Sequence, residues 1–171
     1  IADAGIDPSE IDLVICCTVT GDQVFPATAC RIGKEIGAVR AGGFDVAAAC
    51  SGFVFGSQIA AGFIRSGVYK TVLVVGAEIL SRIVDYTDRN TCVLFGDGAG
   101  AVLLEAQTGS GTTADRGILA TDLNSDGTQR ELLYVDGGTS TGTTGYLRMQ
   151  GNQVFRHAVG KLAETATTAM E

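Results

Sequence analysis

Histidine, proline and charged side chains are scarce in this sequence. It has one histidine and two prolines in 171 residues, and charged residues make up 18%. The single histidine, and the absence of any C-x-x-C pair among the five cysteines, argue against a zinc site, so we expect no metal. Twenty-four glycines with so few prolines suit tight turns and close backbone contacts rather than a disordered chain.

Long apolar runs and an excess of basic charge are also missing. No apolar stretch reaches the length that spans a membrane, and no signal peptide is visible. Twelve basic against nineteen acidic residues give a net charge of −7, which argues against a general nucleic-acid binder. The odd number of cysteines is most simply explained by reduced thiols. We therefore expect a cytoplasmic protein with no membrane and no nucleic-acid partner.

Strand-like and helical segments alternate in the first half of the chain. Apolar runs typical of buried strands occur at residues 12–17, 43–48 and 71–75. Helical segments separate them at residues 26–37 and 51–66, and we expect the second of these helices to be buried on every side because it is apolar or small almost all round. This order predicts an α/β fold with a parallel sheet. Further strands are predicted at 92–95, 99–105, 117–123 and 131–135, and a final helix from about residue 152.

Cys50 lies where the second strand is expected to turn into a helix. Small residues stand two positions before and after it, Ala48 and Gly52, as in the G-x-S-x-G turn that exposes a nucleophile. The N-terminus of the following helix would favour the thiolate, which is the attacking form. The alternative is a buried thiol that packs as a small hydrophobe. Cys50 is therefore a candidate nucleophile.

Three other features carry weaker signals. GDGAG (96–100) is followed by a strand-like run without Lys-Ser or Lys-Thr, so close backbone packing explains it better than a phosphate site. Arg82 and Arg89 follow the third strand and would bind an anion or pair with neighbouring aspartates. His157 is off the apolar face of the final helix and suits a solvated position better than a catalytic base.

Five stretches, in the same order and spacing, resemble β-ketoacyl-acyl carrier protein synthase III, a condensing enzyme of the thiolase fold. They are DVAAACSGF (45–53), LVVGAE (73–78), DYTDR (85–89), FGDGAGA (95–101) and GNQVF (151–155). The resemblance implies a layered α-β-α-β-α fold. It further implies that residues 1–171 are most of the N-terminal half-domain, incomplete at the front, whose final helix leads toward a C-terminal half.

The resemblance also implies a reaction. Cys50 would accept an acyl group from an acyl-CoA, either acetyl-CoA or a short branched starter. Malonyl-acyl carrier protein would then lose carbon dioxide and condense with that acyl group, which initiates type II fatty acid biosynthesis. The coenzyme A thioester is a substrate, so no cofactor is expected.

Other positions match the rest of the family's site. They are Arg89, Met149 and Phe155 for coenzyme A binding, Phe25, Leu80 and Phe95 for the acyl pocket, and Arg156 for the carrier protein. Phe25 matches a residue that reaches into the partner subunit, which implies a homodimer. Asn90 stands where the family more usually has glycine.

Some of the family's motifs are missing from these residues. The sequence has no His-Gln-Ala-Asn stretch, no asparagine before Thr-Ser and no late glycine-rich loop. We therefore expect the 171-residue chain alone to be inactive in condensation. Two further readings are a synthase III-like acyltransferase of a secondary, polyketide-type pathway, and a non-catalytic assembly half whose cysteine only packs.

Overall fold

Two units make up the chain, whose residues 1–171 are all described by the computed structural model. The first unit comprises Ile1–Glu78 and Gly98–Leu119, and the second comprises Ile79–Asp97 and Ala120–Glu171. Each unit combines two segments that are distant in sequence. The division into units therefore does not coincide with a linker that the composition would reveal.

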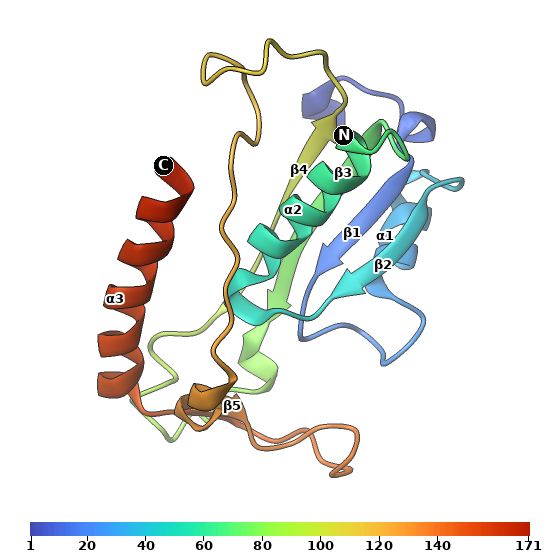
Figure 1. Ribbon diagram of the computed structural model, residues 1–171. Helices are drawn as coiled ribbons and strands as arrows, with labels where there is room; N and C mark the ends of the chain where they lie inside the picture. Colours follow the sequence, from blue (N-terminus) through green and yellow to red (C-terminus); the bar gives the residue numbers. More distant parts are fainter. The chain divides into compact units, whose positions relative to one another are not determined.

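A four-stranded sheet is the centre of the first unit (Figure 1). Its spatial order is β2-β1-β3-β4, with bounds β1 (Leu13–Cys17), β2 (Gly42–Val46), β3 (Thr71–Ile79) and β4 (Asp97–Glu105). β1 runs parallel to both neighbours, so that Ile15 lies opposite Phe44 and Val74. β4 points the other way in Figure 1, and the Ala106 N–H at its end donates to the Lys70 carbonyl at the start of β3 (2.7 Å). The three predicted strands are thus parallel, with an antiparallel strand at one edge.

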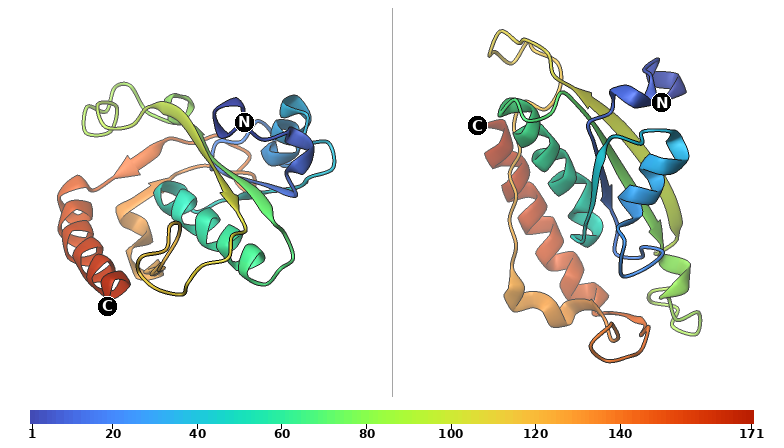
Figure 2. Two further views of the ribbon diagram at one scale, coloured as in Figure 1. Left: turned by 90° about the horizontal axis from the view of Figure 1, so that it is seen from above. Right: turned by 90° about the vertical axis from the view of Figure 1, so that its right-hand side faces the viewer.

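Helices cover opposite faces of this sheet, as the right-hand view of Figure 2 shows. Val14 and Cys16 of β1 pack with Ala29 of α1 (Thr28–Ile36). Ile15 of the same strand packs in a second cluster with Ala60 of α2 (Gly52–Arg65). Alternate side chains of a strand point to opposite faces, so a continuous apolar run is required here. The prediction of a strand buried on both faces is confirmed.

Within these 171 residues α2 is buried on one face, whereas the sequence predicts a helix buried all round. Its buried residues are Gly52, Gly56, Ala60 and Ala61, and they recur about every four positions. Phe53 and Val54 are 41% and 46% exposed. Small residues therefore mark the face that packs on the sheet, because they allow the helix to approach it closely.

The second unit is built on a short hairpin and a long helix. The antiparallel strands β5 (Leu133–Val135) and β6 (Leu147–Met149) pair Tyr134 with Arg148. α3 (Gly151–Met170) follows, close to its predicted start. The short 3₁₀-helices of the chain are η1 (Ala2–Ala4), η2 (Pro8–Glu10), η3 (Ala49–Ser51), η4 (Leu80–Arg82) and η5 (Gly127–Leu132). None of the helices has the length and apolar character needed to cross a membrane.

Two predicted strands are wrong. Residues 117–123 form no strand, and neither do residues 92–95, of which 92–94 lie in a turn. The Asp88 carbonyl accepts hydrogen bonds from the N–H groups of Thr91 (3.2 Å) and Cys92 (3.0 Å), and the Asp88 carboxylate accepts one from the Thr91 hydroxyl (3.2 Å). Local hydrogen bonding by an aspartate therefore overrides the apolar pattern of this segment.

Candidate active site

Cys50 lies in a tight turn between strand β2 and helix α2. It is the middle residue of η3, and α2 begins two residues later, at Gly52. Ala49 has a φ of 46°, a left-handed conformation that a non-glycine residue adopts at a cost of roughly 1–3 kcal/mol. Cys50 itself is exposed. The turn therefore presents the thiol to solvent next to a helix N-terminus, which is the geometry that the flanking small residues predict.

Two glycines of α2 allow this helix to lie directly on β1. A methyl group on Gly52 would come within 3.2 Å of the Cys17 Cβ. On Gly56 it would lie 2.4 Å from the Cys17 Sγ and 3.2 Å from a Val74 methyl carbon. Larger side chains at these two positions would force the helix away from the sheet. The close contact fixes the start of α2, and therefore the turn that carries Cys50.

Asp45 ties the strand that precedes Cys50 to helix α1. Its carboxylate accepts hydrogen bonds from the backbone N–H groups of Thr28 (2.7 Å) and Ala29 (2.9 Å). These groups belong to the first turn of α1, which has no other side-chain cap, and a negative charge at a helix N-terminus is favourable. α1 therefore begins at Thr28, two residues after the predicted start at Pro26.

Glu78 holds the segment that follows β1. Its carboxylate accepts hydrogen bonds from the Val19 N–H (2.9 Å), from the Thr20 hydroxyl (2.5 Å) and, at 3.5 Å, from the Thr18 hydroxyl. Glu78 lies near the carboxyl end of β3, and the carboxyl ends of parallel strands share one edge of a sheet. The turn after β2 leaves from this same edge, so Glu78 orders the surroundings of the thiol-bearing turn.

Burial separates the five thiols. Cys16 is fully buried in β1, and burial is the main cause that raises the pKa of its thiol to about 12. Burial also raises the pKa of Cys17. Cys30 and Cys50 are exposed, and Cys92 is half-buried. Of the two exposed thiols, only Cys50 lies in a strand–helix turn; Cys30 lies within α1 with its Sγ 3.6 Å from the Gly43 carbonyl oxygen.

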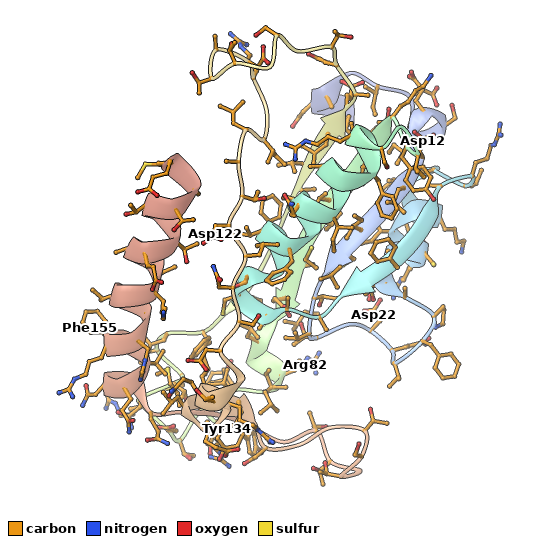
Figure 3. All side chains as sticks on the ribbon, in the orientation of Figure 1. Asp12, Asp22, Arg82, Asp122, Tyr134 and Phe155 are labelled. Carbon is orange, nitrogen blue, oxygen red and sulfur yellow. The ribbon has the colours of Figure 1, made fainter.

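The second unit contains a pocket of about 800 Å³. One wall is the end of β6 and the start of α3, with Met149 and Phe155, and the other holds Asn90 and Leu94. Phe155 projects outward from α3 and is 70% exposed (Figure 3). The pocket thus combines apolar side chains with polar residues of the first turn of a helix.

The sequence-predicted site residues fall in both units. Cys50 and Phe25 belong to the first unit, where Phe25 is 82% exposed. The second unit holds the others, and Met149 and Phe155 line one pocket. Arg89 is exposed beside the pocket residue Asn90. The remaining three are Leu80 and Phe95, both half-buried, and Arg156, which is exposed.

Known proteins are similar to this chain over nearly all of its length. Residues 44–127, which include Cys50, match the family model described as 3-oxoacyl-[acyl-carrier-protein (ACP)] synthase III. The β-ketoacyl-[acyl-carrier-protein] synthase III of Roseobacter denitrificans is 64% identical over 168 residues, which cover 98% of this chain and 52% of the relative. This chain belongs to the synthase III family.

Solved structures of the synthase III family share the fold. The 3-oxoacyl-[acyl-carrier-protein] synthase III of Aquifex aeolicus matches with a TM-score of 0.86 and 43% identity over 98% of this chain and 51% of its own. The priming β-ketosynthase of the R1128 polyketide pathway matches with a TM-score of 0.83 and 34% identity over 96% of this chain and 49% of its own. The fold is therefore that of the thiolase-type condensing enzymes, and the chain spans about half the length of the curated relatives it matches.

Proposed function

We propose that the protein is a β-ketoacyl-acyl carrier protein synthase III, which condenses an acyl-CoA with malonyl-acyl carrier protein to initiate type II fatty acid biosynthesis. The observation that carries this proposal is the exposed Cys50 in a strained strand–helix turn, within the residues that match the family model. Acetyl-CoA or a short branched acyl-CoA is the proposed starter. The protein would act in the cytoplasm as a homodimer and would need neither a metal nor a cofactor.

The first proposed step transfers the acyl group to Cys50. The thiolate attacks the thioester carbonyl carbon, and coenzyme A leaves as a thiolate that takes up a proton. The backbone N–H of Cys50 would stabilise the oxyanion that forms on the carbonyl oxygen. One thioester replaces another, so this step is nearly balanced in energy.

The second proposed step forms the new carbon–carbon bond. The malonyl group loses carbon dioxide, and the electron pair of the broken bond remains as a carbanion. This carbanion attacks the acyl carbonyl carbon, and Cys50 leaves as a thiolate. The family completes this step with a histidine and an asparagine in motifs that these 171 residues lack. We therefore predict that the chain alone does not condense, and formation of acetoacetyl-carrier product by it would contradict this.

The pocket of the second unit supports a binding role for its neighbours. We propose that Arg89, Met149 and Phe155 bind coenzyme A, and the pocket lining by Met149 and Phe155 supports this. Phe25, Leu80 and Phe95 are the proposed acyl-pocket residues. Arg156, exposed on α3, is the proposed carrier-protein contact. Residues 1–171 would form the N-terminal half-domain of the complete enzyme.

Labelled acetyl-CoA tests the first step in the intact protein that contains these residues. We expect the label on the peptide that carries Cys50 and no label in Cys50→Ser. Cys30→Ser is the matched control because Cys30 is the other exposed thiol, and it should label normally. An unlabelled Cys50 would instead favour a non-catalytic assembly role.

The similarity to the R1128 priming β-ketosynthase supports the polyketide-type pathway of one alternative within the same class, though not its lack of condensation. In this reading the protein moves an acyl group in a secondary, polyketide-type pathway without decarboxylative condensation. Release of carbon dioxide from malonyl-acyl carrier protein, dependent on an acylated Cys50, would support fatty acid initiation. Acylation without any release of carbon dioxide would support the alternative.

A further inference from the structure

Arg148 of β6 is held between two carboxylates of the second unit. Its Nε donates to Asp136 Oδ2 at 2.7 Å, and its Nη1 lies 3.5 Å from Asp85 Oδ2. The guanidinium also lies over the ring of Tyr146, 5.5 Å from the ring centre. The Tyr146 N–H donates to the other oxygen of Asp136 (2.6 Å), so both sides of that carboxylate are bound. The guanidinium therefore has a fixed place.

Arg148 connects the two chain segments that lead to the pocket walls. Arg148 directly precedes the wall residue Met149. Asp85 begins the segment that reaches the opposite wall at Asn90, and its carboxylate also accepts hydrogen bonds from the N–H (3.0 Å) and hydroxyl (2.6 Å) of Thr87. The ion pair thus connects an ordered turn that precedes one wall to the strand that leads into the other.

Only one other bond between these two segments is seen beside the arginine. The Leu147 N–H donates to the Ile83 carbonyl at 2.8 Å. A single backbone bond at this point fixes the distance between the segments but does not by itself fix their relative orientation. The contact from Arg148 to Asp85 is nearer the pocket residues than that bond along both segments, and it provides a second point of attachment.

The charges favour the same conclusion. Without the arginine, Asp85 and Asp136 would face the gap that Arg148 occupies as two uncompensated negative charges. The Arg148 side chain is 39% exposed, so water screens the pairs and their contribution to global stability is small. Loss of the arginine is therefore expected to change the geometry of the pocket more than the folding of the unit.

We propose that Arg148 is a positioning residue that sets the separation of the two pocket walls and thereby the affinity for the acyl-CoA substrate. This inference rests on the proposed function, because it assigns the pocket to the coenzyme A thioester. Arg148 acts through Asp85 and through the start of α3.

The kinetic test uses the intact protein with acetyl-CoA as the varied substrate. Arg148→Met removes the charge and keeps most of the length, and it should raise KM about threefold to tenfold with kcat within about twofold of wild type. The KM of Arg148→Lys should lie between those of wild type and Arg148→Met. Added salt should reduce the ratio of the KM of Arg148→Met to the KM of wild type, because salt screens the ion pairs of the wild type. Arg130→Gln is the control, since Arg130 is paired with the adjacent Glu131 (3.1 Å) and should leave KM unchanged.

A KM of Arg148→Met within about twofold of wild type would overturn the proposal, as would a loss of kcat with KM unchanged. If Arg148→Met fails to fold, Asp85→Asn serves instead, because it removes one of the two pairs. It should raise KM in the same direction, and an unchanged KM would overturn the proposal.

Hydrogen exchange separates this proposal from the proposed function. Amides of residues 86–90 should exchange faster in Arg148→Met than in wild type or Arg130→Gln, whether or not acetyl-CoA is turned over. Unchanged exchange would overturn the role of Arg148. Faster exchange in a protein whose wild type does not acylate Cys50 would show that Arg148 orders this segment, but it would refute the proposed function and with it the role in acyl-CoA affinity.

Discussion

Substitution of Gly56 by alanine tests how α2 is held on the sheet. The added methyl group would lie 2.4 Å from the Cys17 Sγ and 3.2 Å from Val74 Cγ1, so the helix or the strand must shift. Overpacking of a core typically costs about 1–3 kcal/mol, and the better helix propensity of alanine returns up to about 1 kcal/mol. We expect a net loss of about 1–2 kcal/mol. In a chain of this length, that lowers Tm by roughly 2–8 °C.

Gly62 provides the matched control in the same helix. A methyl group there meets no atom within 4 Å, so Gly62→Ala should raise stability by up to about 1 kcal/mol. Thermal unfolding followed by circular dichroism measures both variants. Cys17→Ala removes the sulfur atom, so Gly56→Ala should destabilise less in that background than in wild type. Equal Tm values for Gly56→Ala and Gly62→Ala would refute the close contact between α2 and β1.

Three further outcomes follow from burial, charge and hydrogen bonding. In the native protein, iodoacetamide should alkylate Cys50 and leave Cys16 unmodified, because Cys16 is buried with a thiol pKa of about 12; peptide mass spectrometry measures both. Hydrogen bonds from the Tyr146 N–H and Arg148 lower the pKa of Asp136 below its ordinary 3.8. Their stabilisation is therefore complete above that value and is lost as the pH falls through the lower folded-state pKa, so amide exchange near Arg148, corrected for the intrinsic pH effect, should rise in acid. Glu78→Gln weakens three charge-assisted hydrogen bonds and should cost about 1 kcal/mol, measured by thermal unfolding.

Each of these outcomes has a contrary result. Rapid alkylation of Cys16 in the folded protein would contradict its burial. If acid affected exchange equally in Arg148→Met and in wild type, the pairs of Arg148 would not be the cause. A Glu78→Gln protein that resists heat and proteolysis of residues 18–25 as well as wild type would show that this carboxylate does not order the segment.

The elements around Cys50 were predictable because their signals are local. A continuous apolar run marks a strand buried on both faces, and β1 is one. The small residues on either side of Cys50 mark the turn, and the chain bends there through η3 into α2. In each case neighbours in the sequence are also the groups that determine the conformation.

Elements fixed by distant partners were not predictable in this way. β6 is only three residues long, and it forms because it pairs with β5, which lies about fourteen positions earlier in the sequence. The roles of Asp45 and Glu78 also depend on segments that only the fold brings near, such as the start of α1 at Thr28 and the segment after β1 at Val19. The role of Arg148 also depends on a distant partner, because Asp85 is 63 positions away in the sequence. A sequence pattern gives the residue types at such places but not their partners.

The glycines of α2 lie between these two cases. Gly52 and Gly56 are four positions apart in the sequence, a spacing that places them on one face of a helix and is typical of close packing against a neighbouring element. The structure identifies that partner as Cys17 of β1, and it shows that the large side chains Phe53 and Val54 lie on the other face. Within these residues only one face of the helix is buried, because apolar residue types alone do not show which face another segment covers.

The central claim is that Cys50 carries the acyl group. The most direct measurement is mass spectrometry of the intact protein after incubation with acetyl-CoA, followed by mapping of the adduct. The account predicts one acetyl group on Cys50, absent in Cys50→Ser and retained in Cys30→Ser. An acetyl group on another residue, or none on a folded protein that retains an exposed Cys50, would contradict it.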